Sequence, residues 1–132
     1  MVNGIKKLSL LEWEIMNIIW AQNKKLAVRD VLAIAYPNGE KAYTTVQTVL
    51  NNLETKGYLT KEKIGLVNFY SAIKSQEEIV KKETSSFVKR VYNGSFKALA
   101  NYLIDSNNLT EDEIADLQFL IKQKELKGKR KP

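Results

Sequence analysis

The sequence predicts a mostly α-helical protein that carries one small β-hairpin. Three observations lead to this prediction. Serine or threonine stands three positions before Glu or Gln at four places, which is the spacing of helix capping boxes. Apolar residues then recur at helical intervals. One stretch changes to alternating apolar and polar residues around a glycine, as hairpins do. A chain of 132 residues is one small domain, or one with an appendage.

The first helix is predicted to begin at the capping box formed by Ser9 and Glu12. Apolar residues follow at helical spacing as far as Trp20, and the polar segment 22–25 interrupts the pattern. A second, short helix is expected over residues 28–36. It ends at the turn residues 37–39, Pro-Asn-Gly.

A third helix is predicted over residues 44–56. Thr44 and Gln47 have the spacing of a weaker capping box, and Gly57 is expected to end the helix in the left-handed conformation. One face of this helix is apolar and is expected to lie in the core. It consists of Val46, Val49, Leu50 and Leu53.

Residues 58–63 and 67–73 then alternate on either side of Gly65, which predicts a hairpin. Two short helices with a tight connection form a helix-turn-helix, and a hairpin directly after them makes a winged version. We therefore expect a winged helix-turn-helix domain over residues 1–74.

The remainder of the chain is predicted to be helical. Capping boxes open helices at Ser75 and at Thr110, and Asn93-Gly94 separates a further helix between them. We assign residues 75–126 to one helical region. Residues 127–132 form a basic end that we expect to be a frayed, disordered tail.

The third helix is the predicted reading element for DNA. Its outward face holds only Thr, Gln and Asn, whereas exposed helix positions more often hold Lys and Glu. Asn and Gln can pair with adenine, and Thr can contact a base edge or a thymine methyl group. A plain solvated face is the alternative interpretation. The candidates for base contacts are Thr44, Thr45, Gln47, Thr48 and Asn51.

Basic and polar residues around this helix are the candidates for phosphate contacts. Each lysine or arginine that neutralises a phosphate releases a counterion. Any one of them is also consistent with an ordinary solvated charge, so the prediction concerns the set. It consists of Lys24, Arg29, Lys41, Tyr43, Lys61 and Lys63.

The C-terminal helices carry more apolar surface than a few short helices can bury alone, which predicts a dimerisation region over residues 75–126. A two-fold dimer also suits the reading of palindromic DNA. The alternative is a monomer in which these helices fold back on the first domain. The dimerisation candidates are Phe87, Val91, Phe96, Leu99, Leu103, Ile114, Leu117, Leu120 and Ile121.

The composition excludes several classes of enzyme and metal site. The chain has no Cys and no His, so it has no thiolate or imidazole ligands and no Ser-His-Asp or Cys-His nucleophile system. The acidic run 111–113 is interpreted as the first turn of a helix, where acids favour the helix dipole. We expect no enzyme activity, no cofactor and no metal. With no targeting signal and no membrane-length apolar run, we expect a cytoplasmic protein.

The net charge of +6 is unevenly distributed. Residues 1–74 hold 10 basic and 6 acidic side chains, and residues 75–121 hold 5 basic and 8 acidic ones. The segment 122–132 accounts for most of the excess, with 6 basic residues and 1 acidic residue. The whole-chain charge is therefore a weak argument for DNA binding, while the basic N-terminal domain remains compatible with it.

The first helix resembles the opening helix of the penicillinase-repressor (BlaI/MecI/CopY) family. It carries that family's Ser-x-x-Glu-Trp-x-x-Met-x-x-x-Trp pattern, from Ser9 to Trp20. The resemblance covers nearly the whole chain. Segment 45–53 with Lys56-Gly57 is similar to the family's recognition helix and 69–71 to its wing strand, while Phe87 with 92–95, and 109–117, resemble its dimerisation region.

The resemblance implies a homodimeric winged-helix repressor that binds an operator dyad in double-stranded DNA. In the β-lactam branch of the family a membrane sensor-protease signals, and the repressor is cut in its dimerisation region at an Asn-Phe bond. Asn101-Tyr102 occupies the similar place in this chain. The copper branch uses Cys-x-Cys pairs, which this chain lacks. Thr44 and Asn52 stand where the family often has Lys and Arg, which affects operator identity.

Two functions therefore stay open from the sequence. The first is a sequence-specific repressor, of the β-lactam-resistance type and relieved by proteolysis, whose partners are operator DNA, a second copy of itself and a membrane sensor-protease or its signalling product. The second is a winged-helix protein-interaction module without specific duplex binding, since a fold does not determine a function.

Overall fold

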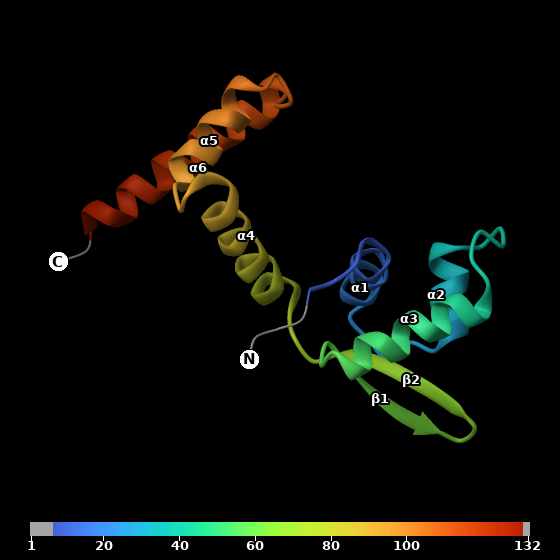
Figure 1. Ribbon diagram of the computed structural model, residues 1–132. Helices are drawn as coiled ribbons and strands as arrows, with labels where there is room; N and C mark the ends of the chain where they lie inside the picture. The colour runs from blue at the N-terminus through green and yellow to red at the C-terminus, as the bar shows by residue number, and fades with distance from the viewer. Residues whose placement is uncertain (1–6, 131–132) are drawn as a thin grey trace. The chain divides into compact units, whose positions relative to one another are not determined.

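The computed structural model describes residues 7–130, with side chains as far as residue 128 (Figure 1). It contains six helices and one antiparallel hairpin in this described part, which confirms the predicted mostly helical fold with a β-hairpin wing. The elements are α1 (Leu10–Gln22), α2 (Val28–Ala35), α3 (Tyr43–Thr55), β1 (Leu59–Ile64), β2 (Val67–Ala72), α4 (Gln76–Tyr92), α5 (Phe96–Asp105) and α6 (Glu111–Arg130).

The chain divides into two compact units between Lys82 and Glu83, inside α4. The boundary we expect from the sequence, after residue 74, falls just before this helix begins. The first turns of α4 belong with the N-terminal unit, because Ile79 is buried in the core of that unit.

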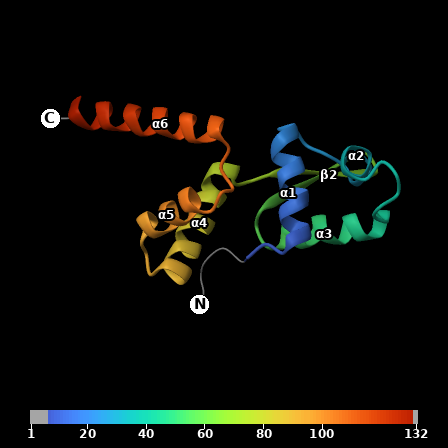
Figure 2. The same cartoon turned by 90° about the horizontal axis from the view of Figure 1, so that it is seen from above.

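The N-terminal unit is built around one core to which α1, α2, α3 and the hairpin all contribute. Figure 2 shows that α1 and α3 cross rather than run parallel. The apolar face predicted for the third helix is buried as expected. The fully buried core side chains include Ile15, Met16, Ile19, Val31, Val46, Leu50, Leu53, Tyr58, Leu59 and Tyr70.

The capping box of α1 is confirmed. Ser9 Oγ accepts a hydrogen bond from the Glu12 amide at 3.2 Å, and the Ser9 amide donates to Glu12 Oε1 at 2.8 Å. Asn23 ends the helix in the left-handed conformation with a φ of 52°. The rings of Trp13 and Trp20 meet edge to face, with centroids 6.1 Å apart. The Trp20 indole donates to the carbonyl of Lys74 at 2.9 Å.

The start of α3 differs from the prediction. The N-cap is Ala42, and no side chain caps the helix. Thr44 is already inside the first helical turn, so the predicted capping box of Thr44 and Gln47 is wrong. An N-cap residue needs non-helical backbone angles, which Ala42 has and a residue inside the helix does not.

The end of α3 follows the prediction. Gly57 has a φ of 89° and donates to the carbonyl of Glu54 at 3.1 Å, while the Tyr58 amide donates to the carbonyl of Leu53 at 2.9 Å. This pair of bonds is a Schellman motif, which satisfies carbonyl groups at the helix end.

The wing is a two-stranded antiparallel hairpin in which Leu59 pairs with Ala72 and Ile64 pairs with Val67. The connection has two residues, Gly65 and Leu66. Only Gly65 has a positive φ (65°), as in a type II′ turn. The hairpin is also tied to the segment before α2, because the backbones of Leu26 and Tyr70 exchange hydrogen bonds of 2.9 and 2.8 Å.

In the C-terminal unit the predicted helix starts are confirmed. Ser95 Oγ accepts from the Ala98 amide at 3.0 Å. Thr110 and Glu113 form both bonds of a capping box, at 3.0 and 3.1 Å. The last helix continues through Arg130, four residues into the segment that we assign to a tail, and residues 131–132 lie outside the described part. None of the described helices is long and apolar enough to cross a lipid bilayer.

Candidate nucleic-acid interface

The outward face of α3 is exposed along its N-terminal half. Thr44, Thr45, Gln47 and Thr48 are all exposed, and Val46 and Leu50 on the opposite face fix the helix to the core. Since the apolar face determines the rotation of the helix, the polar side chains are presented outward together. Four of the five candidates for base contacts therefore share one accessible surface.

The fifth candidate, Asn51, is half-buried and has partners within the chain. Its Oδ1 accepts from the Tyr70 hydroxyl at 2.8 Å and from Lys61 Nζ at 3.2 Å. Tyr70 lies on β2, and Lys61 is its paired residue on β1. The side chain of Asn51 thus joins α3 to the wing.

A hollow of about 380 Å³ lies between the start of α2, α3 and the wing. It brings together residues that are far apart in the sequence: Arg29 from α2, Tyr43 and Gln47 from α3, and Asn68 from β2. Two candidates for phosphate contacts and one candidate for a base contact therefore border the same depression. Arginine, tyrosine and amide side chains are among those that contact phosphates and base edges in protein–DNA complexes.

The candidates for phosphate contacts are all exposed. Among the side chains that the structure describes, Lys24, Arg29, Lys41 and Lys63 form no ion pair. The neighbouring Lys25 does form one, with Glu62 on β1 at 2.9 Å. Unpaired cations are the ones whose counterions a phosphate can displace.

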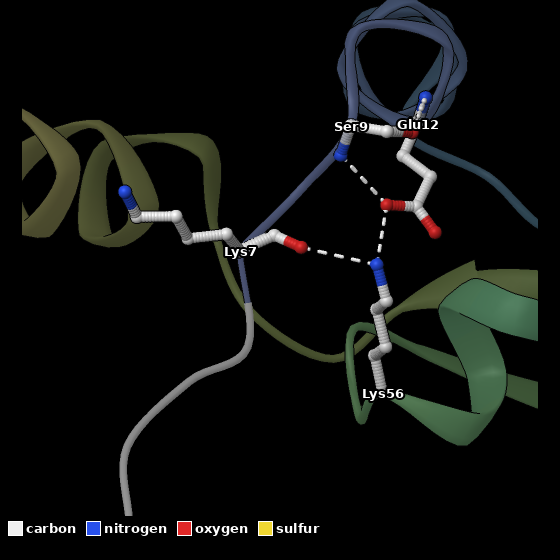
Figure 3. Close-up of polar contacts among 4 residues, drawn as sticks. All are labelled: Lys7, Ser9, Glu12 and Lys56. Atoms are coloured by element: carbon white, nitrogen blue, oxygen red, sulfur yellow. Dashed lines mark hydrogen bonds and ion pairs between the residues drawn. The ribbon is translucent and has the colours of Figure 1, made fainter.

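The shorter of the two ion pairs in the described part of the chain lies at the C-terminal end of α3 and was not predicted. Lys56, at the end of α3, approaches Glu12 Oε1 to 2.6 Å and also donates to the carbonyl of Lys7 at 3.0 Å (Figure 3). The same Glu12 oxygen accepts from the Ser9 amide. Glu12 thereby connects the start of α1 to the end of α3.

The protonation of Glu12 reflects this environment. Burial raises the pKa of the Glu12 carboxyl, but the hydrogen bond from Lys56, the Ser9 amide and the positive charge of Lys56 together hold that pKa below its ordinary value. Glu12 is therefore ionised in the folded protein and acts as a charged acceptor. Elsewhere in this unit the buried Tyr36 hydroxyl donates to Glu14, and burial together with this carboxylate raises the pKa of Tyr36.

No sequence signal indicated the roles of Lys56 and Tyr70. Lys56 precedes a helix-stop glycine, where lysine is common, and Tyr70 belongs to an alternating strand pattern that predicts only burial. Both contacts join residues distant in the sequence, so only the tertiary arrangement defines them.

The apolar residues named as dimerisation candidates lie in the C-terminal unit and on exposed surface of this single chain. All except the half-buried Leu99 are between 39% and 60% exposed. Val88 is the one residue of α4–α6, apart from Ile79, that the structure describes as buried. Asn101 and Tyr102 lie side by side in α5, where both are exposed.

The element order α1–α2–α3–β1–β2 and the polar face of α3 define a winged helix-turn-helix protein. The sequence profile of the penicillinase repressor family matches residues 8–123, and the chain belongs to this family. It is a DNA-binding transcriptional repressor and not an enzyme.

Three relatives that are named as repressors or resistance regulators align with nearly the whole chain. The methicillin resistance regulatory protein MecI of Staphylococcus aureus strain N315 is 27% identical over 124 residues, which cover 94% of this chain and 100% of MecI. The penicillinase repressor of Staphylococcus aureus is 26% identical and covers 92% of this chain and 95% of its own length. The penicillinase repressor of Bacillus licheniformis is 25% identical and covers 90% and 92%.

Proposed function

We propose that this repressor acts as a homodimer on a palindromic operator, with one winged helix on each half-site. The observation that carries the proposal is the polar face of α3, which is exposed and faces a hollow shared with the wing and with Arg29. Gln47 and Thr48 contact base edges in the major groove. Lys41, Tyr43, Lys63, Lys24 and Arg29 contact phosphates on either side.

Dimerisation is assigned to residues 75–126. The apolar side chains of α5 and α6 support this assignment, because the described part of this unit leaves Phe96, Leu117 and Leu120 between 40% and 60% exposed. A large exposed apolar surface indicates an interaction site. A two-fold dimer buries equivalent faces of two chains and places two reading helices on a symmetric operator.

The regulated genes are proposed to be of the β-lactam-resistance type, on the basis of the MecI and penicillinase repressor relatives. Release from the operator is proposed to follow cleavage of the Asn101–Tyr102 bond by a signalling protease. Both residues are exposed, and α5 contains no buried residue, so local unwinding of this helix loses little packing. Cutting there separates α6 from the rest of the dimerisation region.

The test is a gel-shift titration against the promoters of the protein's own and neighbouring genes, with sedimentation of the same samples at micromolar concentration. We expect a specific complex of two chains per operator. Absence of sequence-specific duplex binding at physiological salt would instead support the interaction-module alternative. For the cleavage step, normal induction in a host carrying Asn101→Ala and Tyr102→Ala would rule out this bond as the signal.

A further inference from the structure

The amide oxygen of Asn51 is fully used inside the protein. Tyr70 donates its hydroxyl hydrogen at 2.8 Å and Lys61 donates at 3.2 Å. A carbonyl oxygen has two lone pairs, and an ammonium group can only donate, so the oxygen rather than the nitrogen of the amide must face Lys61. The orientation of the side chain is therefore fixed, and its acceptor has no further capacity.

Tyr70 is a rigid partner for this contact. It is 1% exposed, its backbone pairs with Lys61 on β1, and on its other side it pairs with Leu26 just before α2. Burial, with the nearby Tyr43 and Glu54, raises the pKa of the Tyr70 hydroxyl, so the group stays protonated and able to donate. One residue thus connects the wing, the segment before α2 and, through Asn51, the recognition helix.

Recognition of adenine by asparagine needs both ends of the amide. The oxygen accepts from the adenine N6 amino group while the NH₂ group donates to N7. Asn51 has only its NH₂ group left for a ligand. We propose that Asn51 is a positioning residue that locks the wing to α3, and that Gln47 rather than Asn51 provides amide-type adenine recognition on this helix.

The inference rests on the proposed function, because it concerns how the reading helix and the wing meet the same operator. Asn51 also holds Lys61 beside α3 and leaves the remaining donors of the ammonium group available to a phosphate. Gln47 differs from Asn51 in that it is exposed and lines the hollow between α3 and the wing. Gln47 and Asn51 therefore have different tasks on the same helix: Asn51 holds the wing against α3, and Gln47 contacts bases.

The decisive experiment compares Asn51→Ala with Tyr70→Phe, which removes only the hydroxyl of a side chain that is 1% exposed. Affinity is measured for the operator and for a full set of its single-base-pair variants. We expect each substitution to lower affinity by about 3- to 10-fold, the usual effect of one lost hydrogen bond. The loss should be equal across all operator variants, and the double variant should bind no more weakly than the weaker single variant.

The matched control is Ser71→Ala, which removes the cross-strand contact with Thr60 in the same hairpin. It should leave unchanged both the affinity for the operator and the relative affinities for its single-base-pair variants. Gln47→Ala, by contrast, should relax discrimination at one base pair. If Asn51→Ala relaxes discrimination at one A·T pair while Tyr70→Phe keeps the wild-type profile, Asn51 reads adenine directly and the inference is wrong.

A second measurement does not depend on DNA. Backbone hydrogen exchange at Leu26 and Tyr70 reports the attachment of the wing, and we expect about tenfold faster exchange in Asn51→Ala and in Tyr70→Phe than in Ser71→Ala. Unchanged exchange in both folded variants would overturn the positioning role. If the wild-type protein bound no specific duplex, the proposed function would fail, while this exchange result would still decide the role of Asn51.

Discussion

Lys56 and Glu12 form an ion pair of 2.6 Å that links the end of α3 to the start of α1. The two side chains are only 26% and 5% exposed. An ion pair with this degree of burial, and with further hydrogen bonds to Ser9 and Lys7, differs from a solvated surface pair because removal of one partner leaves a desolvated charge. The orientation of α3 therefore depends on a contact made outside its polar face.

Lys56→Met should lower the free energy of unfolding by about 1–3 kcal/mol, because the Glu12 carboxylate loses a charged donor while staying buried. Urea denaturation followed by circular dichroism measures the change. The control is Lys25→Met, which removes the exposed pair with Glu62 and should cost about 0–1 kcal/mol. Equal losses of unfolding free energy in the two variants would show that the buried Lys56–Glu12 pair stabilises the fold no more than the exposed Lys25–Glu62 pair.

The same pair predicts an acid dependence of stability. The folded-state pKa of Glu12 lies below its ordinary value of 4.5, so the unfolded chain binds more protons in this range. The contribution of Glu12 is complete above that ordinary value and is lost as pH falls through the lowered folded-state pKa. The difference in unfolding free energy between wild type and Glu12→Gln should therefore be constant near neutral pH and shrink as the pH falls below 4.5, through the lowered folded-state pKa. A pH-independent difference would argue against an ionised Glu12.

Gly57→Ala should destabilise the protein by about 1–2 kcal/mol, because a residue with a side chain is strained at a φ of 89°. The space around the residue is open, so a steric clash with neighbours is not the cause. Gly128→Ala provides the comparison, since Gly128 lies within α6, where alanine favours the helix by about 0.5–1 kcal/mol. In thermal unfolding, Gly57→Ala should lower the melting temperature and Gly128→Ala should not.

Gln47→Ala and Thr48→Ala should each weaken specific operator binding by about 1–3 kcal/mol, as expected for lost base contacts. Lys63→Ala should act differently. It should reduce the magnitude of the slope of log affinity against log salt concentration by about 1, the value for one lost phosphate contact. Fluorescence anisotropy over a salt series separates the two effects. Unchanged operator affinity in both Gln47→Ala and Thr48→Ala would remove the reading role from this face of α3.

Leu120→Asp should shift the protein toward the monomer, because a charge in the middle of an apolar contact must be desolvated without a partner. Sedimentation velocity at micromolar concentration measures this shift, and gel-shift titration should show a parallel loss of operator binding. Asp112→Ala, on the acidic first turn of α6, serves as the control. A wild-type protein that sediments purely as a monomer would remove the two-half-site arrangement.

The elements that the sequence predicted well are those determined by local contacts. The capping boxes at Ser9 and Thr110 and the stop at Gly57 need only neighbouring residues, and all three are present. Thr44 shows the limit of this reasoning: its spacing suited a capping box, but the helix begins at Tyr43, so Thr44 has helical backbone angles. A short motif is compatible with more than one helix start.

The sequence predicted which side chains of α3 are exposed, but it did not predict the tertiary contacts that α3 makes. The apolar positions of α3 determine which side chains point outward, so the exposure of Gln47 and Thr48 follows from the sequence pattern. The pairing of Asn51 with Tyr70 joins residues 19 positions apart, and that of Lys56 with Glu12 joins residues 44 apart. Neither residue type nor periodicity specifies such partners.

The position of the two tryptophans makes the N-terminal unit observable by itself. Trp13 and Trp20 are the only tryptophans of the chain, and both lie on α1. Their edge-to-face contact and the indole hydrogen bond to Lys74 exist only while this unit is folded. Tryptophan emission therefore reports the unfolding of the N-terminal unit and gives no signal from the C-terminal unit, which has no tryptophan.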